Sequence, residues 1–179
     1  GETFHKPKLV PCQISIKASK AGDDIRVDPG VITMHTMSLK TSGKITGLTN
    51  PNFDLVIGTN DTSMKGWESL VPSLKEYEPD GNFTFQGSMK GTLGDLSANL
   101  QFSAPRLAVK VSQATGGNKD ATPSKSVFEF MDMKVQAEKK NNDIKGSGNL
   151  EIKKGVVMAA AFEKMQAQFD YQSDVLGIH

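Results

Sequence analysis

The sequence predicts a mainly β fold, a long and curved antiparallel meander that forms a groove or a partly closed barrel. The first observation is the segment from Phe83 to Leu93, where apolar residues and glycines alternate with polar ones. The second is Gly94-Asp95, which fits a two-residue hairpin turn. The third is a further alternating segment from Leu96 to Phe102. Because successive side chains of a strand point to opposite faces, each strand has one apolar and one polar face.

The first half of the chain carries the same pattern. Alternation predicts strands at residues 13–18, 25–27, 37–45 and 53–57. Turn-forming residues separate these strands, and Asp28-Pro29-Gly30 is one such predicted turn. His35 falls inside a predicted strand, beside Thr33 and Met37.

Residues 62–75 depart from this pattern and predict one short α-helix. Trp67, Leu70 and Leu74 follow one another at spacings of three and four, which is helical periodicity. Pro72 indicates two short turns or a kink, because proline lacks the amide proton that a helix interior uses. We expect this helix to lie on the sheet or to plug its end, with Trp67 as a packing residue.

The second half continues the meander. Residues 113–126 are mostly Thr, Gly, Asn, Lys and Ser, and they predict an exposed, flexible loop. The alternation changes parity between Phe128 and Met131, which predicts a β-bulge near Phe130. Alternation predicts further strands at residues 131–137, 144–152 and 165–171.

Length and charge limit the classes of function. The 179 residues suit a single domain, and 21 basic against 20 acidic residues give a net charge of +1. This balance provides no basic surface for nucleic acid or for an anionic membrane. The apolar run that includes Val156–Ala161 is far shorter than the roughly 20 residues of a membrane helix. Because the chain begins without Met and stops within an alternating segment, we expect it to be part of a longer protein that carries any anchor.

The sequence offers no arrangement for catalysis or for a metal. His5, His35 and His179 lie far apart, and none accompanies a recognisable nucleophile and orienting group. Cys12 is the one cysteine, so it forms no intrachain disulfide, and no Cys or His stands at ligand spacing from it. We therefore expect no enzyme activity, no metal and no cofactor.

The apolar faces of the predicted strands need a cover. It can be a second sheet, closure into a barrel, helices or a bound apolar ligand. Only one short helix is predicted, and the bare face of one long strand would forfeit several kcal/mol at roughly 25 cal/mol per Å². We therefore expect an open apolar groove that takes the acyl chains of a lipid. The candidate groove residues are Met37, Leu39, Ile45, Phe53, Leu55, Phe83, Phe85, Met89, Leu100, Phe102, Leu150 and Ile152.

Two other classes of protein remain open. The first is a structural or adhesive β-sandwich without a ligand, in which the apolar faces of two sheets pair with each other. The second is a jelly-roll carbohydrate binder or enzyme, which ranks last because one Trp and two Tyr supply few rings for sugar stacking.

Several segments resemble a known family when taken in order. They are Ser42-Gly-Lys-Ile-Thr-Gly47, Asn50-Pro-Asn-Phe-Asp-Leu-Val-Ile57, Trp67-Glu-Ser-Leu-Val-Pro-Ser-Leu74, Asp80-Gly-Asn-Phe-Thr-Phe-Gln-Gly87 and Lys90-Gly-Thr-Leu-Gly-Asp-Leu-Ser-Ala-Asn-Leu100. Together with the later Gly148-Asn-Leu-Glu-Ile-Lys-Lys-Gly155, they resemble the C-terminal region of the bacterial AsmA-like proteins, relatives of TamB. The likeness covers roughly residues 30–179. It is a likeness of pattern, so no individual binding residue carries over.

The resemblance implies a long, curved antiparallel sheet with an apolar groove in the periplasm of a double-membraned bacterium. AsmA-like proteins carry an N-terminal inner-membrane anchor and are implicated in phospholipid transport and outer-membrane assembly. The implied partners are a phospholipid or another acyl lipid, together with other envelope proteins. Membrane contact would then come only through an anchor or flanking regions that this sequence lacks.

Overall fold

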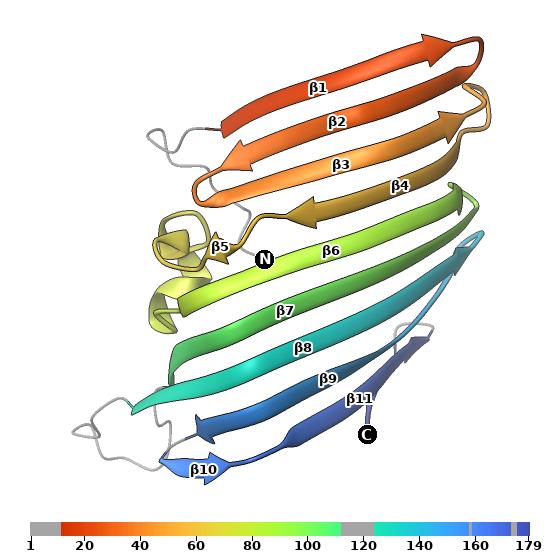
Figure 1. Cartoon of the computed structure of the whole chain (residues 1–179). Helices are drawn as coiled ribbons and strands as arrows, with labels where there is room; N and C mark the ends of the chain where they lie inside the picture. Colours follow the sequence, from red (N-terminus) through yellow and green to blue (C-terminus); the bar gives the residue numbers. More distant parts are fainter. Residues whose placement is uncertain (1–11, 112–123, 158, 173–174) are drawn as a thin grey trace.

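A computed structural model of the chain describes residues 12–111, 124–157, 159–172 and 175–179. These residues form one antiparallel 12-stranded sheet with almost no helix (Figure 1). The strands are β1 (Cys12–Ala21), β2 (Asp24–Met34), β3 (Met37–Thr46), β4 (Asn52–Thr59), β5 (Thr62–Ser63), β6 (Asp80–Thr92), β7 (Asp95–Val111), β8 (Ser124–Lys140), β9 (Asp143–Val157), β10 (Ala160–Phe162), β11 (Met165–Gln172) and β12 (Val175–Ile178). Two 3-10 turns, η1 (Trp67–Ser69) and η2 (Pro72–Glu76), lie between β5 and β6.

The sheet is an open meander. Its strand order is β1-β2-β3-β4-β6-β7-β8-β9-β11-β12, while the short β5 pairs with β6 and the short β10 with β9. Within the described ranges no pairing joins β1 to β12, so the sheet does not close into a barrel. The predicted mainly β, antiparallel meander is confirmed, in the form of an open curved sheet.

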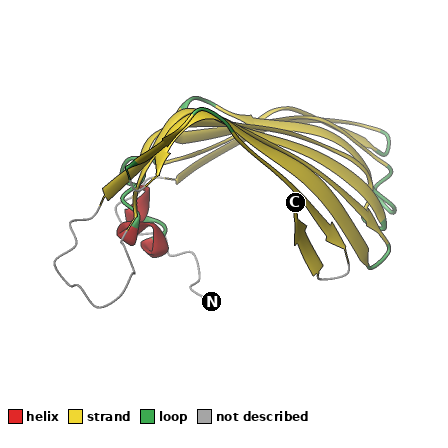
Figure 2. Cartoon of the chain, turned by 90° about the horizontal axis from the view of Figure 1, so that it is seen from below, coloured by secondary structure: helices red, strands yellow, loops and turns green. Residues whose placement is uncertain are grey.

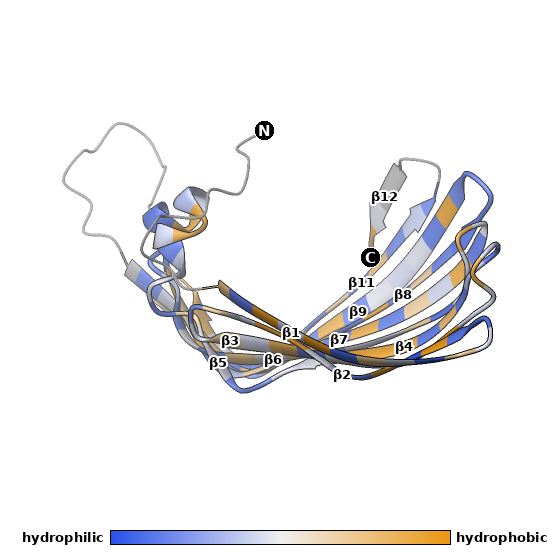
Figure 3. Ribbon diagram, turned by 90° about the horizontal axis from the view of Figure 1, so that it is seen from above, coloured by the Kyte–Doolittle hydropathy of each residue, from blue (hydrophilic) through white to orange (hydrophobic). Residues whose placement is uncertain are grey.

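The sheet bends into an arch, because the strands themselves curve along their length. Figure 2 shows this arch with the 3-10 turns on its concave side, near one end of the strands. Figure 3 shows the same shape as a trough, with hydrophobic positions distributed along the strands. The hollow of the trough therefore runs across the strands, in the direction in which they are hydrogen-bonded to one another.

Two predicted turns are placed differently by the structure. Asp28-Pro29 lies inside β2, where the pairing register with both β1 and β3 shifts between Val27 and Gly30. A bulge tolerates proline because the residue need not donate to the ladder, so the strand continues where the sequence predicted a turn. His35 lies in the turn between β2 and β3 rather than inside a strand, with a φ of 53°.

The predicted α-helix at residues 62–75 is wrong in type and length, whereas the two short turns that Pro72 indicated are confirmed. Thr62–Ser63 forms β5, and the remaining helical residues are the turns η1 and η2. Val71 separates these turns in an extended conformation, and Pro72 occupies the start of η2. Proline is accepted in the first turn of a helix and excluded from its interior, which is why the segment divides at this point.

The predicted irregularity at Phe130 is present, but it is not a bulge. Phe130 has a φ of 54°, and its side chain is 56% exposed. The pairing register of β8 is the same on both sides of Phe130 against both β7 and β9, so no residue is inserted. Within the predicted loop at 113–126, residues 113–123 lie outside the described part. Residues 124–126 belong to β8, because their backbone pairs with the end of β7.

The sheet has almost no closed core. Among the described residues the buried hydrophobic ones are Leu70, Ala104, Ala108 and Ile152. A single layer leaves most other apolar side chains only half-buried, because no second layer of described residues packs against them. No helix within the described ranges has the length and apolar character needed to cross a bilayer.

Candidate functional site

The candidate site is built from rows of side chains that cross the sheet. Residues paired across neighbouring strands lie on the same face, as do residues two apart along one strand. One such row crosses all ten strands of the main path. It consists of Ile16, Gly30, Thr41, Ile57, Gly87, Leu100, Val135, Gly148, Phe169 and Ile178. No charged residue interrupts this row, and Thr41 is its one polar member.

Apolar rows flank this central row on the same face. On one side, Phe85, Phe102, Met133, Leu150 and Ala167 are paired in succession. On the other side, Leu55, Met89, Ala98 and Ala137 are paired in succession. The three rows together form a continuous apolar surface several residues wide.

Ring contacts show that this apolar surface is the concave side of the arch. The Phe83 and Phe102 rings are stacked with centroids 5.4 Å apart. The Trp67 ring meets the edge of Phe83 at 6.5 Å, and Trp67 belongs to η1, which lies on the concave side (Figure 2). We call this surface the concave face: it consists of the three rows, these rings and the side chains that continue the rows at two-residue spacing along the strands.

All twelve predicted groove residues lie on the concave face. The pairing register brings Leu55 opposite Met89 and Phe85 opposite Phe102. Ile152 is buried, whereas the other eleven are half-buried. The twelve residues are distributed over the strands as Met37, Leu39 and Ile45 on β3, Phe53 and Leu55 on β4, Phe83, Phe85 and Met89 on β6, Leu100 and Phe102 on β7, and Leu150 and Ile152 on β9.

The sequence-based candidate list omitted residues that the register places at the centre of the concave face. Ile57, Val135 and Phe169 belong to the central row. Val135 and Phe169 alternate with polar neighbours, and Ile57 shares the parity of Phe53 and Leu55, so the signal was present in the sequence. The pairing register, which no local pattern contains, decides that these residues become neighbours of Gly87 and Gly148.

Glycines in the central row leave room that larger neighbours fill. A β-carbon added to Gly87 would lie 2.8 Å from Cδ2 of Leu100 and 3.2 Å from Cγ1 of Ile57. A β-carbon on Gly148 would collide with the ring of Phe169. The side chains of these neighbours therefore lean over the glycines and keep the concave face apolar there.

One segment lies over an end of the concave face, and we call it the insert (residues 60–79). Asn60 fixes its start, because its Oδ1 accepts a hydrogen bond from the Ser38 amide at 2.6 Å and its Nδ2 donates to the Thr36 carbonyl at 3.1 Å. The Trp67 indole donates to Thr36 Oγ1 at 3.0 Å. Leu70 is fully buried. The insert is thus held firmly against the β2–β3 turn.

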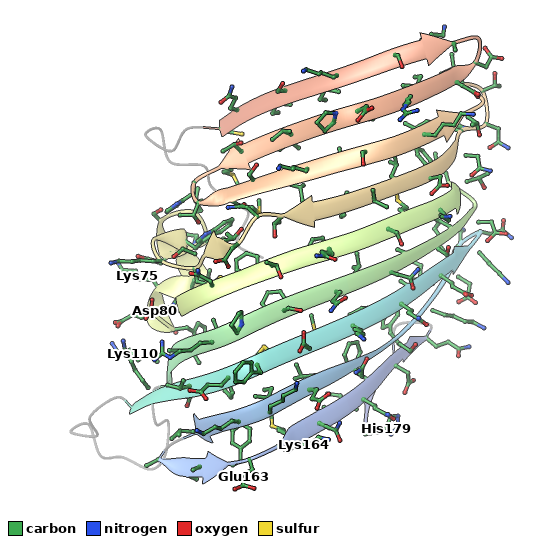
Figure 4. All side chains as sticks on the ribbon, in the orientation of Figure 1. Lys75, Asp80, Lys110, Glu163, Lys164 and His179 are labelled. Carbon is green, nitrogen blue, oxygen red and sulfur yellow. The ribbon has the colours of Figure 1, made fainter. Side chains whose placement is uncertain are left out.

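The other end of the insert is fixed to β7. The Lys110 amide donates to the Tyr77 carbonyl at 2.6 Å, and Lys110 Nζ lies 2.6 Å from Glu78 Oε1. The side-chain hydrogen bond from Lys110 to Glu78 and the positive charge of Lys110 hold the pKa of Glu78 below its ordinary value of 4.5. Figure 4 places Lys110 at the same end of the sheet as Lys75 and Asp80.

The opposite face of the sheet is polar and carries ion pairs. Lys44 Nζ lies 2.6 Å from Asp24 Oδ2, and Lys90 Nζ lies 3.5 Å from Asp54 Oδ1. These pairs are exposed, so each contributes little to stability. A hollow of about 740 Å³ on this side is lined by Lys44, Asp54 and Val56 among others. The two faces therefore differ sharply in chemistry.

Of the described histidines, His35 packs against Trp67 and His179 is the last residue of the sequence. The His35 ring is stacked on Trp67, with centroids 6.1 Å apart and an interplanar angle of 10°. His179 Nε2 lies 2.8 Å from Asp170 Oδ1 at an exposed position, and His5 lies outside the described residues. Within the described ranges no group of three His, Cys, Asp or Glu side chains could hold a metal ion.

No protein-family model matches the chain, and no curated protein or solved structure matches it either. The concave face is therefore the main structural evidence for function.

Proposed function

We propose that the concave face binds the acyl chains of a phospholipid or another acyl lipid. The observation that carries this proposal is the row of uncharged side chains that crosses all ten strands of an open, single-layer sheet. Exposed apolar surfaces of this extent mark binding sites in soluble proteins. The insert lies over only one end of this face (Figure 2), so a long apolar ligand would find most of it accessible.

The dimensions of the concave face suit a chain-like ligand. Neighbouring strands lie about 4.8 Å apart, so ten strands extend over about 43 Å. Burial of each methylene group of a ligand against the face contributes about 0.8 kcal/mol. A long acyl chain lying along the trough would therefore gain many small contributions without any specific polar contact.

The cellular setting forms part of the same proposal. The resemblance to AsmA-like proteins supports a place in the periplasm, as a segment of a longer protein anchored in the inner membrane. There the concave face would serve lipid transport or outer-membrane assembly rather than catalysis. The polar opposite face, with its exposed ion pairs, suits an aqueous compartment.

The experiment is to purify the chain without detergent and to examine it by native mass spectrometry and lipid extraction. We expect acyl lipid to co-purify, and we expect the delipidated protein to bind a fluorescent fatty acid. Replacing Leu100 by Asn should weaken this binding roughly tenfold, because a leucine side chain contributes about 1.5–3 kcal/mol on burial.

The matched control is Gln101→Asn, since Gln101 is the next residue along β7 and faces the opposite side of the sheet. This variant should bind the fatty acid as the parent does. A delipidated protein that binds no fatty acid would refute the proposal. Equal losses of fatty-acid affinity in Leu100→Asn and Gln101→Asn would show that binding does not use the concave face.

The two-layer sandwich has less support. All twelve strands belong to one sheet, so a second layer would have to come from outside the described residues. In that arrangement the concave face would be covered by protein and would bind no fatty acid, which the same titration distinguishes.

A further inference from the structure

Among the described strands, β1 is the last at its edge of the sheet. β1 is ten residues long, pairs only with β2 among the described strands, and has every residue exposed. Its register with β2 places Ile14 and Ile16 on the concave face, where they are 63% and 65% exposed. These two side chains are so exposed because β2 is the one described strand that flanks β1.

Natural edge strands usually carry devices that prevent pairing, such as bulges, prolines and inward-pointing charges. Between Cys12 and Ala21 there is no proline. The nearby irregularity places its additional residue in β2, where Asp28 and Pro29 lie opposite the single Lys17 of β1. The inward-pointing charge of β1 is Lys20, near the end of the strand, so the segment from Cys12 to Ser19 presents a regular backbone edge that can accept another strand.

We propose that β1 pairs antiparallel with β1 of a second copy of this chain, about a two-fold axis at Ser15. This register sets Ile14 opposite Ile16 twice on the concave face. On the polar face it sets Gln13 opposite Lys17 and the two Ser15 residues opposite each other. Apolar and β-branched cross-strand pairs stabilise a sheet, and the side-chain oxygen of Gln13 can accept a hydrogen bond from the Lys17 ammonium.

The strand's own sequence selects this register over its neighbours. An axis at Lys17 would set two ammonium groups opposite each other, which is destabilising. An axis at Ile16 would bring Lys20 into the paired segment, opposite Cys12, and would place its ammonium group on the apolar concave face. In the Ser15 register Lys20 lies beyond the paired residues. The net charge of +1 adds little repulsion between two copies.

The pairing would join two sheets into one. A two-fold axis normal to the sheet keeps the concave faces of both copies on the same side, so the apolar surface would continue from one copy into the next. An isologous contact of this kind closes after two copies and does not propagate into a fibre. This inference does not depend on the identity of any ligand.

The register is tested with cysteine variants of the full chain. Directly opposed residues of an antiparallel pair have Cα atoms about 4.5–5.5 Å apart, which suits a disulfide. In a Cys12→Ser background, Ser15→Cys should form an intermolecular disulfide under mild oxidation. Ser19→Cys in the same background is the control, because its two copies would lie about 27 Å apart at about 3.4 Å per residue.

Association is tested with charge variants and light scattering after size-exclusion chromatography. We expect the parent chain to show twice the monomer mass at high concentration. Ser15→Asp and Ser15→Lys should each be monomeric, because like charges oppose each other at the axis, and an equimolar mixture should dimerise again. Both substitutions lie on an exposed edge, and circular dichroism checks that each variant remains folded.

The proposal would be overturned by a parent chain that stays monomeric at every concentration. It would also be overturned by a dimer that Ser15→Asp leaves intact, or by equal cross-linking of Ser15→Cys and Ser19→Cys. Restoration of the dimer by mixing opposite charges supports the proposed axis directly.

Discussion

Gly43 is a position where a single methyl group should disturb the sheet. Its φ is 139°, a conformation that L-residues rarely adopt, and an added β-carbon would lie 2.9 Å from Cα of Leu55 and collide with the Asp54 carbonyl oxygen. Backbone atoms cannot move aside as a flexible side chain does. We expect Gly43→Ala to lower the free energy of unfolding by about 2 kcal/mol or more, measured by urea denaturation.

Gly94→Ala provides the control for this prediction. Gly94 is exposed in the β6–β7 hairpin, and the nearest atom to an added β-carbon is Asn141 Oδ1 at 4.0 Å. Its free energy of unfolding should change by no more than about 0.5 kcal/mol. Equal destabilisation by both substitutions would show that the close approach at Gly43 does not exist.

At the residue scale, sequence alternation predicted the face of a side chain well and its neighbours poorly. Leu55 and Met89 were each assigned to the apolar face from their own strands, and the structure places both there. Leu55 and Met89 oppose each other because of the register between β4 and β6, two strands that the insert separates in the sequence. Val135 was overlooked for the same reason, since its importance comes from its partners Leu100 and Gly148.

At the scale of elements, the contact between Glu78 and Lys110 should make the insert sensitive to acid. Because the folded pKa of Glu78 lies below 4.5, its ionised form stabilises the folded state above pH 4.5, and this stabilisation is lost as the pH falls through the folded pKa. Glu78→Gln should therefore lower the urea midpoint of Trp67 fluorescence at neutral pH. Trp67 is the one tryptophan and lies in the insert, so it reports on this segment.

In acid well below pH 4.5, the parent and Glu78→Gln should give the same midpoint, because Glu78 is then protonated in both folded and unfolded parent protein. Glu76→Gln is the control, since none of the described ion pairs involves Glu76, and its midpoint should match the parent at every pH. If the difference in urea midpoint between the parent and Glu78→Gln persisted unchanged in acid, it would contradict a stabilising role of the ionised Glu78.

The elements that the sequence predicted incorrectly are those where tertiary pairing competes with a local signal. Asp28-Pro29-Gly30 has the composition of a turn, yet hydrogen bonding to β1 and β3 on both sides carries β2 through it as a bulge. Residues 62–75 have helical spacing, but Thr62 and Ser63 pair with β6 and Pro72 ends the possibility of one continuous helix. The strand pairing in both cases comes from other segments of the chain, whereas the effect of Pro72 is local and was recognised from the sequence.

At the scale of the whole molecule, a single-layer sheet should be most stable in its middle. Each strand is held mainly by its two neighbours, so the strands at an edge have half the support. β7 and β8 are the longest strands, with 17 residues each, and they pair with each other along nearly their full length. We expect amide hydrogen exchange to be slowest in β7 and β8 and fastest in β1 and β12.

Hydrogen–deuterium exchange followed by mass spectrometry measures this gradient. Dimerisation through β1 would slow exchange in β1 alone, so the measurement is made at low protein concentration and repeated at high concentration. Uniform protection from β1 to β12 would contradict the expected gradient and would indicate that the sheet unfolds as one cooperative unit.

The overall architecture was predictable because the alternation and the hairpin turns are local signals repeated along the chain. The openness of the sheet was left undecided by the sequence, which allowed a groove or a partly closed barrel. Closure depends on the summed curvature and twist of all strands, and no short segment determines that sum. The same holds for the concave shape on which the proposed function rests.

The order of the strands in the sheet follows their order in the chain, with only the short β5 and β10 beside the path. A sheet with this strand order can be lengthened or shortened one hairpin at a time. Copying one hairpin within the gene would add two strands and about 10 Å to the span, while every other neighbour relationship stayed as it was. The span of the sheet across its strands therefore increases with the length of the gene, and duplication or deletion of hairpins can change this span while the fold stays the same.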